Sequence, residues 1–148
     1  MKQTTKAGSS NKTCLPIKSI MTTDVITVHP EMLIFDAIQL LPKYKVSGLP
    51  VVDVENRLVG ILTEKDVLKI LTKSRINYHD TVAQYMTKDV VAFAETDSAI
   101  TVSKFFETNP IRRVPIVRDG KLIGVVSRRD IIRLILEAKS HLSAYRFS

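Results

Sequence analysis

The chain has 148 residues, a net charge of +7, and 45% hydrophobic and 25% charged side chains, which fits one compact soluble domain with a real core. No apolar run approaches the ~20 residues of a membrane span, and the polar start lacks the apolar segment of a signal peptide. Cys14 is the only cysteine, which excludes a disulfide framework and a cysteine-based metal cage. We therefore expect a cytoplasmic protein with no membrane span and no metal site.

Positive charge is concentrated towards the two ends of the sequence. Residues 1–18 carry four lysines and no acidic residue, and residues 112–146 carry nine basic and three acidic residues. Such clusters favour solubility, or they face an anion such as a phosphate or a nucleic-acid backbone. The sequence leaves both interpretations open.

The first half of the chain predicts a strand, a helix, two strands and a second helix. A short strand over Val25–Val28 precedes an amphipathic helix that Pro30 and Pro42 bracket. Two apolar strands joined by a turn follow, and a closing helix begins just after Thr63. The apolar face of the first helix is expected at Leu33, Ala37, Leu40, Leu41 and Tyr44.

The second half predicts the same order. A strand over Val90–Phe93 precedes a helix with Asp97 as its N-cap. Asp119-Gly120 then predicts a two-residue hairpin turn, because both residues tolerate positive φ. A long closing helix begins just after Ser127 and runs to Ser143. The apolar face of the earlier helix is expected at Ala99, Val102, Phe105 and Phe106.

These two halves are copies of one unit. Met-Thr-Thr-Asp at residues 21–24 returns as Met-Thr-Lys-Asp 65 positions later, and Leu-Pro-Val-Val at residues 49–52 returns as Val-Pro-Ile-Val at the same offset. Leu-Val-Gly-Ile-Leu-Thr at residues 58–63 returns 64 positions later, and so does Asp66, as Asp130. The lost residue falls in the turn between the two strands, where a length change is tolerated.

The duplication predicts an α/β (α+β) sandwich of two β-α-β-β-α motifs. We expect the motifs to pack with pseudo-twofold symmetry, each covering the apolar face of the other, since about 60 residues hold little core alone. The expected segments are a basic arm at 1–15, a first motif at 16–74, a linker at 75–80, a second motif at 81–138, and a helix end and tail at 139–148.

A known family shares these motifs in this order. The openings MTTD and MTKD, the strands SGLPVVD and RRVPIVR, and the segments GILTEKD and GVVSRRD resemble the cystathionine-β-synthase-type (CBS) motif over roughly Pro16 to Glu137. The pair resembles a Bateman module. That resemblance implies a non-catalytic regulatory module which binds an adenosyl ligand in clefts between the motifs and signals to an unknown partner protein or through its own homodimer. It implies AMP, ADP or ATP as ligand, with S-adenosylmethionine as a further candidate, and no required cofactor.

The segment from the glycine to the aspartate carries the chemistry. A helix N-terminus attracts phosphate through its free N–H groups and its dipole, and Thr63 or Ser127 adds a hydroxyl. Asp66 or Asp130, one turn into the helix, is an acceptor suited to ribose hydroxyls, while Gly60 or Gly124 lets a ligand or a neighbouring backbone come close. The same spacing is also a capping box that needs no ligand. Both interpretations stay open and are compatible.

The resemblance implies two nucleotide sites. The segment at the start of each closing helix is expected to work with the opening strand of the other motif. The arginines of site A suggest charge-assisted phosphate contacts and hence the tighter site. Val25, Ile26, Val46 and Val125 are candidates for the adenine slot or for ordinary core. Site A comprises Ser127, Arg129, Asp130, Arg128, Arg112, Arg113, Val125, Asp24, Val25 and Ile26; site B comprises Thr63, Lys65, Asp66, Ile61, Ser47, Gly48, Asp89, Val90 and Val91.

Two other classes of protein are alternatives to a regulatory module, namely an enzyme and a nucleic-acid-binding protein. An enzyme lacks support, because His29, His79 and His141 are scattered and no Gly-Lys-Ser/Thr phosphate loop is present. A basic nucleic-acid-binding CBS-pair protein is the alternative function, favoured by a pI near 9.6. The closing helix carries an apolar stripe that suits either packing in the core or a dimer interface: Ile131, Ile132, Leu134, Ile135, Leu136 and Leu142.

Overall fold

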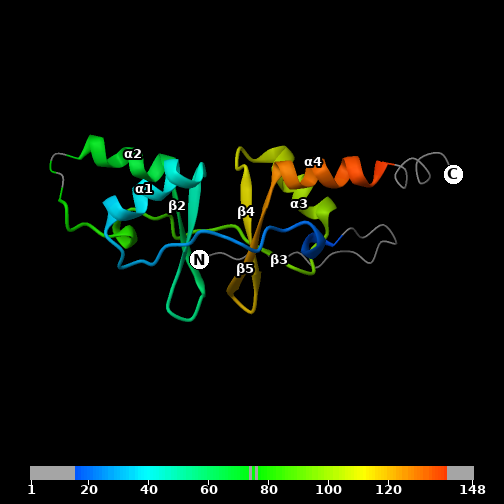
Figure 1. Cartoon of the computed structure of the whole chain (residues 1–148), viewed down its shortest axis with the longest axis horizontal. Coiled ribbons are helices and arrows are strands. Elements are labelled where there is room, and N and C mark those ends of the chain that lie inside the picture. The colour runs from blue at the N-terminus through cyan, green and yellow to red at the C-terminus, as the bar shows by residue number, and fades with distance from the viewer. Residues whose placement is uncertain (1–15, 74, 76, 140–148) are drawn as a thin grey trace. The chain divides into compact units, whose positions relative to one another are not determined.

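The computed structural model describes residues 16–73, 75 and 77–139, and these residues form two compact units (Figure 1). Among them, unit 1 comprises 25–73, 75, 77–91 and 119–122, and unit 2 comprises 16–24, 92–118 and 123–139. The units therefore do not coincide with the sequence repeats. Unit 2 contains the segment that opens the first repeat, and unit 1 contains the segment that opens the second.

Unit 1 holds two helices and a two-stranded antiparallel sheet. Helix α1 (Ile34–Tyr44) is followed by β1 (Gly48–Val52), β2 (Leu58–Thr63) and α2 (Glu64–Thr72), with a short 3-10 helix, η2 (Val82–Gln84). Strands β1 and β2 pair with Leu49 opposite Leu62 and with an irregularity at Val51/Val52. The predicted strand over Val25–Val28 is wrong in extent, since only an isolated parallel bridge between Val28 and Val51 forms there.

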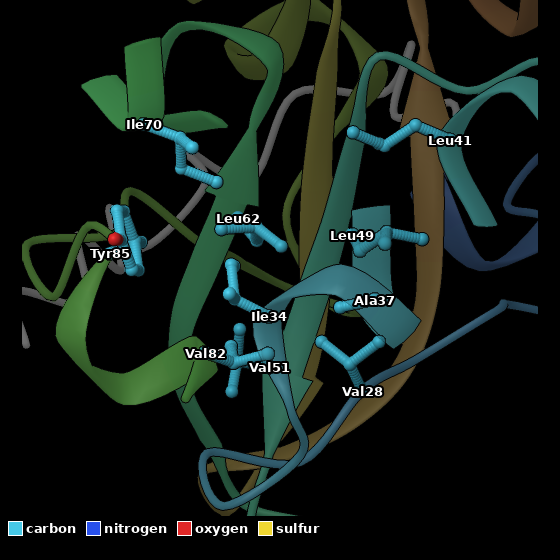
Figure 2. Packing of buried hydrophobic residues seen from close by; sticks show 10 residues of the cluster. All are labelled: Val28, Ile34, Ala37, Leu41, Leu49, Val51, Leu62, Ile70, Val82 and Tyr85. Carbon is cyan, nitrogen blue, oxygen red and sulfur yellow. The ribbon is translucent and has the colours of Figure 1, made fainter. Parts of the chain in front are cut away.

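The core of unit 1 is formed by residues of α1, the β1–β2 sheet, α2 and the segment around η2 (Figure 2). Helix α1 buries Ile34, Ala37 and Leu41, whose spacing places them on one face. Ala37 and Leu41 confirm part of the predicted face, whereas the predicted Leu33 and Tyr44 are 42% and 44% exposed. The buried cluster is Val28, Ile34, Ala37, Leu41, Leu49, Val51, Leu62, Ile70, Val82 and Tyr85.

The first helix also ends later than predicted. Pro42 lies inside α1, and the helix continues to Tyr44. A left-handed residue, Lys45 with φ 54°, then caps it and donates its N–H to the carbonyls of Leu41 and Pro42. The proline is tolerated in the last turn because the helix closes just beyond it.

Unit 2 contains the full β-α-β-β-α order. It comprises β3 (Phe93–Ala94), α3 (Ala99–Thr108), β4 (Arg113–Arg118), β5 (Lys121–Ser127) and α4 (Arg128–Glu137), preceded by the 3-10 helix η1 (Ile17–Ser19); the first two residues of β5 group with unit 1. The sheet order is β3-β4-β5, with β3 parallel to β4. The predicted strand over Val90–Phe93 is therefore displaced and shorter, because only its last residue enters the sheet.

The N-cap of α3 is Ser98 rather than the predicted Asp97. The Ser98 hydroxyl accepts the N–H of Thr101 at 3.2 Å. Asp97 instead turns inward, where it is 2% exposed and accepts the N–H of Ala94 at 2.8 Å. Helix α3 buries Ala99, Val102 and Phe106 of the predicted face, and Phe105 is partly buried with its ring edge-on to Phe93.

The predicted two-residue turn of the second repeat is confirmed. Asp119 and Gly120 adopt φ angles of 51° and 78°. In the first repeat the longer turn uses the side chain of Asp53, whose Oδ1 accepts the N–H groups of Glu55 and Arg57 at 2.9 Å each. The turn of the first repeat is one residue longer, and within it Asn56 adopts a left-handed φ of 63°.

Helix α4 begins as predicted and ends earlier than predicted, at Glu137. Of its apolar stripe only Ile131 is buried, Leu134 is intermediate, and Ile132, Ile135 and Leu136 are 56%, 52% and 68% exposed. The stripe is therefore largely exposed within the described residues. Leu142, Ser143 and His141 lie outside them. Among residues 16–73, 75 and 77–139, no helix is both long enough and apolar enough to cross a bilayer.

Candidate functional site

The closing helix of each repeat starts with the same reciprocal cap. In α2, Asp66 N–H donates to Thr63 Oγ1 at 3.2 Å, while Thr63 N–H donates to Asp66 Oδ2 at 2.9 Å. In α4 the corresponding distances for Ser127 and Asp130 are 3.2 and 2.8 Å. Each hydroxyl also donates to the aspartate, at 2.8 Å from Thr63 and 3.0 Å from Ser127. The capping box that the sequence left open is therefore present in both units.

These caps hold their carboxylates in buried positions. Asp66 and Asp130 are 4% and 5% exposed. A carboxylate offers about four acceptor positions, so donors from the cap occupy only part of its capacity. The number of further hydrogen bonds that each aspartate accepts depends on its neighbours, and these neighbours differ between the two units.

Unit 1 contains every residue predicted for site B. The opening segment of the second repeat crosses β2, where Ile61 and Thr87 exchange backbone hydrogen bonds at 2.9 Å. Ser47 reaches the start of α2, because its carbonyl accepts the N–H of Glu64 at 3.0 Å. Of the other predicted residues, Gly48 pairs with Thr63, Lys65 and Asp89 are exposed, Val90 is buried and Val91 is partly buried.

Thr87 is a site residue that the sequence reasoning missed. Its hydroxyl lies 3.0 Å from Asp66 Oδ1 and 3.2 Å from Oδ2 and donates to this carboxylate. Lys69, one turn further along α2, places its Nζ 3.7 Å from the same Oδ1. The duplicated Met-Thr dipeptide is the sequence signal for this residue, but nothing in its spacing predicts that the Thr87 hydroxyl contacts Asp66.

Unit 2 contains all residues predicted for site A except Val25 and Ile26, which belong to unit 1. Thr22 and Val125 exchange backbone hydrogen bonds at 2.9 Å, as Thr87 and Ile61 do in unit 1. Arg112 reaches the start of α4, since its carbonyl accepts the N–H of Arg128 at 3.0 Å.

Five predicted residues of site A are exposed: Asp24, Arg112, Arg113, Arg128 and Arg129. The exposed Arg133 adds a further cation, with Nη1 3.5 Å from Asp130 Oδ1. Among the described residues, this ion pair and the bonds to Ser127 are the side-chain partners of Asp130. The Thr22 hydroxyl does not repeat the contact that Thr87 makes with Asp66.

Gly60 and Gly124 admit a neighbouring backbone. A Cβ on Gly60 would lie 2.7 Å from Met86 Sδ and 2.9 Å from the carbonyl oxygen of Thr87. On Gly124 it would lie 2.8 Å from Met21 Sδ and 2.9 Å from the carbonyl oxygen of Thr22. Of the two roles that the sequence allowed, close approach of the crossing segment is therefore the one that the contacts show.

Arg128 differs from the other arginines predicted for site A. Its Nε donates to the carbonyl of Ile111 at 3.1 Å, and its Nη2 donates to those of Phe106 and Asn109 at 3.1 and 2.6 Å. Its guanidinium carbon also lies 5.7 Å from the centre of the Phe106 ring. The guanidinium donates to protein carbonyls, so Arg128 binds the end of α3 in this structure, and its role as a phosphate ligand stays a prediction.

The predicted adenine-slot residues show a similar division. Ile26 and Val46 pack against the core of unit 1, and Val90 is 3% exposed. Val25, Val91 and Val125 are partly buried. The core interpretation therefore accounts for the slot candidates Ile26 and Val46, and for the site B residue Val90, without a ligand.

Two residues that follow β3 in the chain have shifted pKa values. Burial raises the pKa of Asp97, and the hydrogen bond from Ala94 opposes that shift. The Arg118 guanidinium, which donates Nε to Glu95 Oε1 at 2.7 Å, holds the pKa of Glu95 below its usual value. Within the described residues, no cluster of three or more His, Cys, Asp or Glu side chains suits a metal ion.

Both the sequence and the structure of the chain match known proteins that contain CBS domains. The family model described as the CBS domain matches residues 17–73 and 82–137. Inosine-5'-monophosphate dehydrogenase of Methanocaldococcus jannaschii is 41% identical over 111 residues, which cover 74% of this chain and 21% of the dehydrogenase. The chain thus resembles about a fifth of that enzyme.

Two solved structures are similar over most of their own length. The structure of CBSX2, an Arabidopsis thaliana CBS-pair protein, in complex with AMP has a TM-score of 0.74 and 30% identity, and the match covers 84% of this chain and 98% of that one. The CBS domain pair of protein MJ0100, in complex with 5'-methylthioadenosine and S-adenosyl-L-methionine, has a TM-score of 0.70 and 30% identity, with the same two coverages.

Proposed function

The chain belongs to the CBS-domain family, with two copies of the domain in tandem, and from that premise we propose that it is a non-catalytic regulatory module for an adenosyl ligand. The ligand binds at the starts of α2 and α4. AMP, ADP or ATP is the first choice, because Arg112, Arg113 and Arg129 are exposed cations at site A and guanidinium groups bind phosphate well.

The observation that carries this proposal is a buried aspartate at a helix N-terminus with exposed arginines beside it. Asp130 supplies acceptors for a pair of ribose hydroxyls. The N-terminus of α4 and the arginines favour the phosphate. The carbonyl of Arg112 accepts a hydrogen bond from the start of α4. The groups proposed to bind the ribose and those proposed to bind the phosphate therefore come from one small region of unit 2.

Ligand binding exchanges some cap contacts for ligand contacts. The Ser127 hydroxyl donates to Asp130, and a bound ribose would compete for the same carboxylate. In unit 1 the ribose would compete with the hydroxyls of both Thr63 and Thr87. Site A therefore gives up fewer internal bonds, and we propose that it is the tighter site.

The relatives support an adenosyl ligand and leave its identity as part of the proposal. CBSX2 is in complex with AMP, and the MJ0100 pair is in complex with two adenosyl compounds that carry no phosphate. The exposed arginines of site A favour the phosphorylated class for this chain.

Calorimetric titration with AMP, ADP, ATP, S-adenosylmethionine and 5'-methylthioadenosine tests the proposal. We expect a phosphorylated ligand to bind the wild type, and Asp130→Ala to weaken the tighter site by about 10–100-fold, the cost of losing hydrogen bonds to a charged group. Asp66→Ala should weaken only the second site. Unchanged affinity in Asp130→Ala together with lost affinity in Asp66→Ala would contradict the order of the sites, and absence of binding by the wild type would contradict the function.

Regulation requires that the module pass its state to another surface. We propose that it signals to a partner protein or through its own dimer, for which Ile132, Ile135 and Leu136 provide exposed apolar area on α4. A ligand shifts such an equilibrium only by its different affinity for the two states. Sedimentation with and without AMP tests the dimer, and a monomer unchanged by AMP would leave only the partner protein.

Nucleic-acid binding is the second candidate, and the exposed arginines Arg112, Arg113, Arg129 and Arg133 are the observation in its favour. Affinity for random duplex that falls steeply with salt would support it. Adenine-specific binding that persists as salt is raised would support the nucleotide module instead. Phosphate release from ATP well above a blank would contradict a non-catalytic role.

A further inference from the structure

The side chain of Arg128 ties two elements of unit 2 together. It starts α4, and its guanidinium donates to carbonyls of Phe106, near the end of α3, and of Asn109 and Ile111, just beyond α3. The last carbonyls of a helix lack partners within the helix, and α3 has no basic residue in its own last turn. Arg128 supplies these missing donors from the neighbouring helix.

The segment after α3 is also held by the backbone of Arg128. The Arg128 N–H donates to the carbonyl of Arg112 at 3.0 Å. Asn109 adds a local bond from its Nδ2 to the carbonyl of Phe105 at 3.0 Å. Residues 109–112 are therefore fixed against α4 mainly by a single residue, which acts through both its side chain and its main chain.

Unit 1 shows what happens without this arginine. The position of Arg128 is occupied there by Glu64, which cannot donate from its carboxylate. The main-chain bond is kept, because the Glu64 N–H donates to the carbonyl of Ser47 at 3.0 Å. In place of the guanidinium contacts the segment after α1 closes on itself, since Lys45 adopts a left-handed φ and the Val46 N–H donates to the carbonyl of Leu41 at 3.1 Å. In unit 2, Asn109 is extended at φ −127° and ψ 141°, so α3 lacks that turn and needs an external donor.

We infer that Arg128 is a positioning residue for the phosphate side of site A. It fixes residues 109–112, and thereby holds Arg112 and Arg113 beside the N-terminus of α4, where the phosphate of a bound nucleotide is proposed to lie. Its own guanidinium does not contact the ligand. The inference rests on the proposed function of site A and adds the device that organises it.

The ratio of the affinities for AMP and adenosine tests this inference, because it isolates the phosphate contribution. In Arg128→Ala we expect the AMP affinity of site A to fall about tenfold, a loss of roughly one charge-assisted hydrogen bond, while the adenosine affinity changes less than about twofold. Arg128→Lys should lie between, because an ammonium cannot span three carbonyls as a planar guanidinium does. Glu64→Ala is the matched control in unit 1 and should leave the ratio unchanged.

A coupling measurement separates positioning from a direct contact or a general loss of structure. In an Arg112→Ala/Arg113→Ala background, Arg128→Ala should lower the AMP to adenosine ratio no further, because the groups that it positions are gone. Circular dichroism and thermal unfolding identify variants that fail to fold, and Arg128→Lys then carries the test.

Each other outcome overturns the inference. An unchanged ratio in Arg128→Ala, or equal losses for AMP and adenosine, overturns the positioning role and leaves the proposed function standing. A further drop of the ratio in the double-arginine background shows that Arg128 contacts the phosphate itself. A wild type that binds neither AMP nor adenosine overturns the proposed function, and the inference with it.

Discussion

The starts of α2 and α4 share one cap and differ in several of the side chains around it. Both helices begin with a hydroxyl and an aspartate that bond reciprocally. Each aspartate has a cation one turn further along its helix, Lys69 for Asp66 and Arg133 for Asp130. Asp66 also receives the Thr87 hydroxyl, a contact that Thr22 does not make with Asp130. Glu64 follows the first cap and Arg128 the second. The backbone thus requires the cap in both places, while the side chains around it make one start better satisfied internally and the other more cationic.

The glycines test the part of the comparison in which the two units agree. Gly60→Ala and Gly124→Ala should each lower the free energy of unfolding by about 2–3 kcal/mol, because the new Cβ would meet a backbone carbonyl at 2.9 Å and the crossing segment would have to move. Urea unfolding measures both. Gly48→Ala is the control, since its Cβ would find neighbours at an ordinary 3.5 Å or more. Tolerance of alanine at only one of the two glycines would show that the Met-Thr segment packs less closely against that glycine than against the other.

Much of this agreement was predictable from the sequence. The glycine, the hydroxyl residue and the aspartate were identified from their duplicated spacing, and the structure confirms the starts of both closing helices. The hairpin at Asp119-Gly120 was equally secure, because turn chemistry is local.

What the sequence did not predict depends on contacts that are distant along the chain. The end of α1 passes Pro42 because the turn at Lys45 caps it, and Asp97 loses the N-cap role to Ser98 because its carboxylate is used at Ala94. Arg128 is predicted as a phosphate ligand from its place beside Arg129 in the segment, whereas the carbonyls that it contacts lie 17 to 22 residues earlier in the chain. Local patterns identify the residue type, and only the fold identifies the partner.

Removing the aspartates sharpens the comparison of stability. Asp66→Ala should cost about 2 kcal/mol, because it leaves the donors of Thr63 and Thr87 without their acceptor. Asp130→Ala should cost about 1 kcal/mol, the usual value of a lost cap. Chemical unfolding without ligand gives both numbers. Asp66→Asn and Asp130→Asn are the controls, since an amide keeps one acceptor, and equal costs for the two alanine variants would contradict the stronger internal satisfaction of Asp66.

The Thr87 hydroxyl gives a smaller effect of the opposite sign. Thr87→Val removes a donor that competes with ribose for Asp66, so we expect site B to bind an adenosyl ligand about threefold more tightly, within the net worth of one hydrogen bond. Thr22→Val, at the equivalent position of unit 2, is the control and should leave site A unchanged. Calorimetry on both variants measures this. Weaker binding at site B in Thr87→Val would show that the hydroxyl assists the ligand.

The smallest effect concerns a buried acid that only unit 2 has at this position, since Met32 is the residue of the first repeat equivalent to Asp97. Burial raises the pKa of Asp97, so the folded protein holds a proton more tightly than the unfolded chain does. Stability therefore falls as pH rises through the window from the ordinary aspartate pKa to the raised value. Asp97→Asn keeps an acceptor for Ala94 and removes this dependence, so its stability relative to wild type should rise across that window in urea unfolding.

Glu95 is the control for that pH dependence, because its shift has the opposite sign. Arg118 lowers the pKa of Glu95, so its contribution is complete above the ordinary glutamate pKa and is lost as pH falls through the lowered value. Glu95→Gln should accordingly lose stability relative to wild type at neutral pH and recover it in acid, whereas Asp97→Asn should gain at neutral pH and lose its advantage in acid. Differences from wild type that run in the same direction for both variants would contradict the burial of Asp97 as the cause.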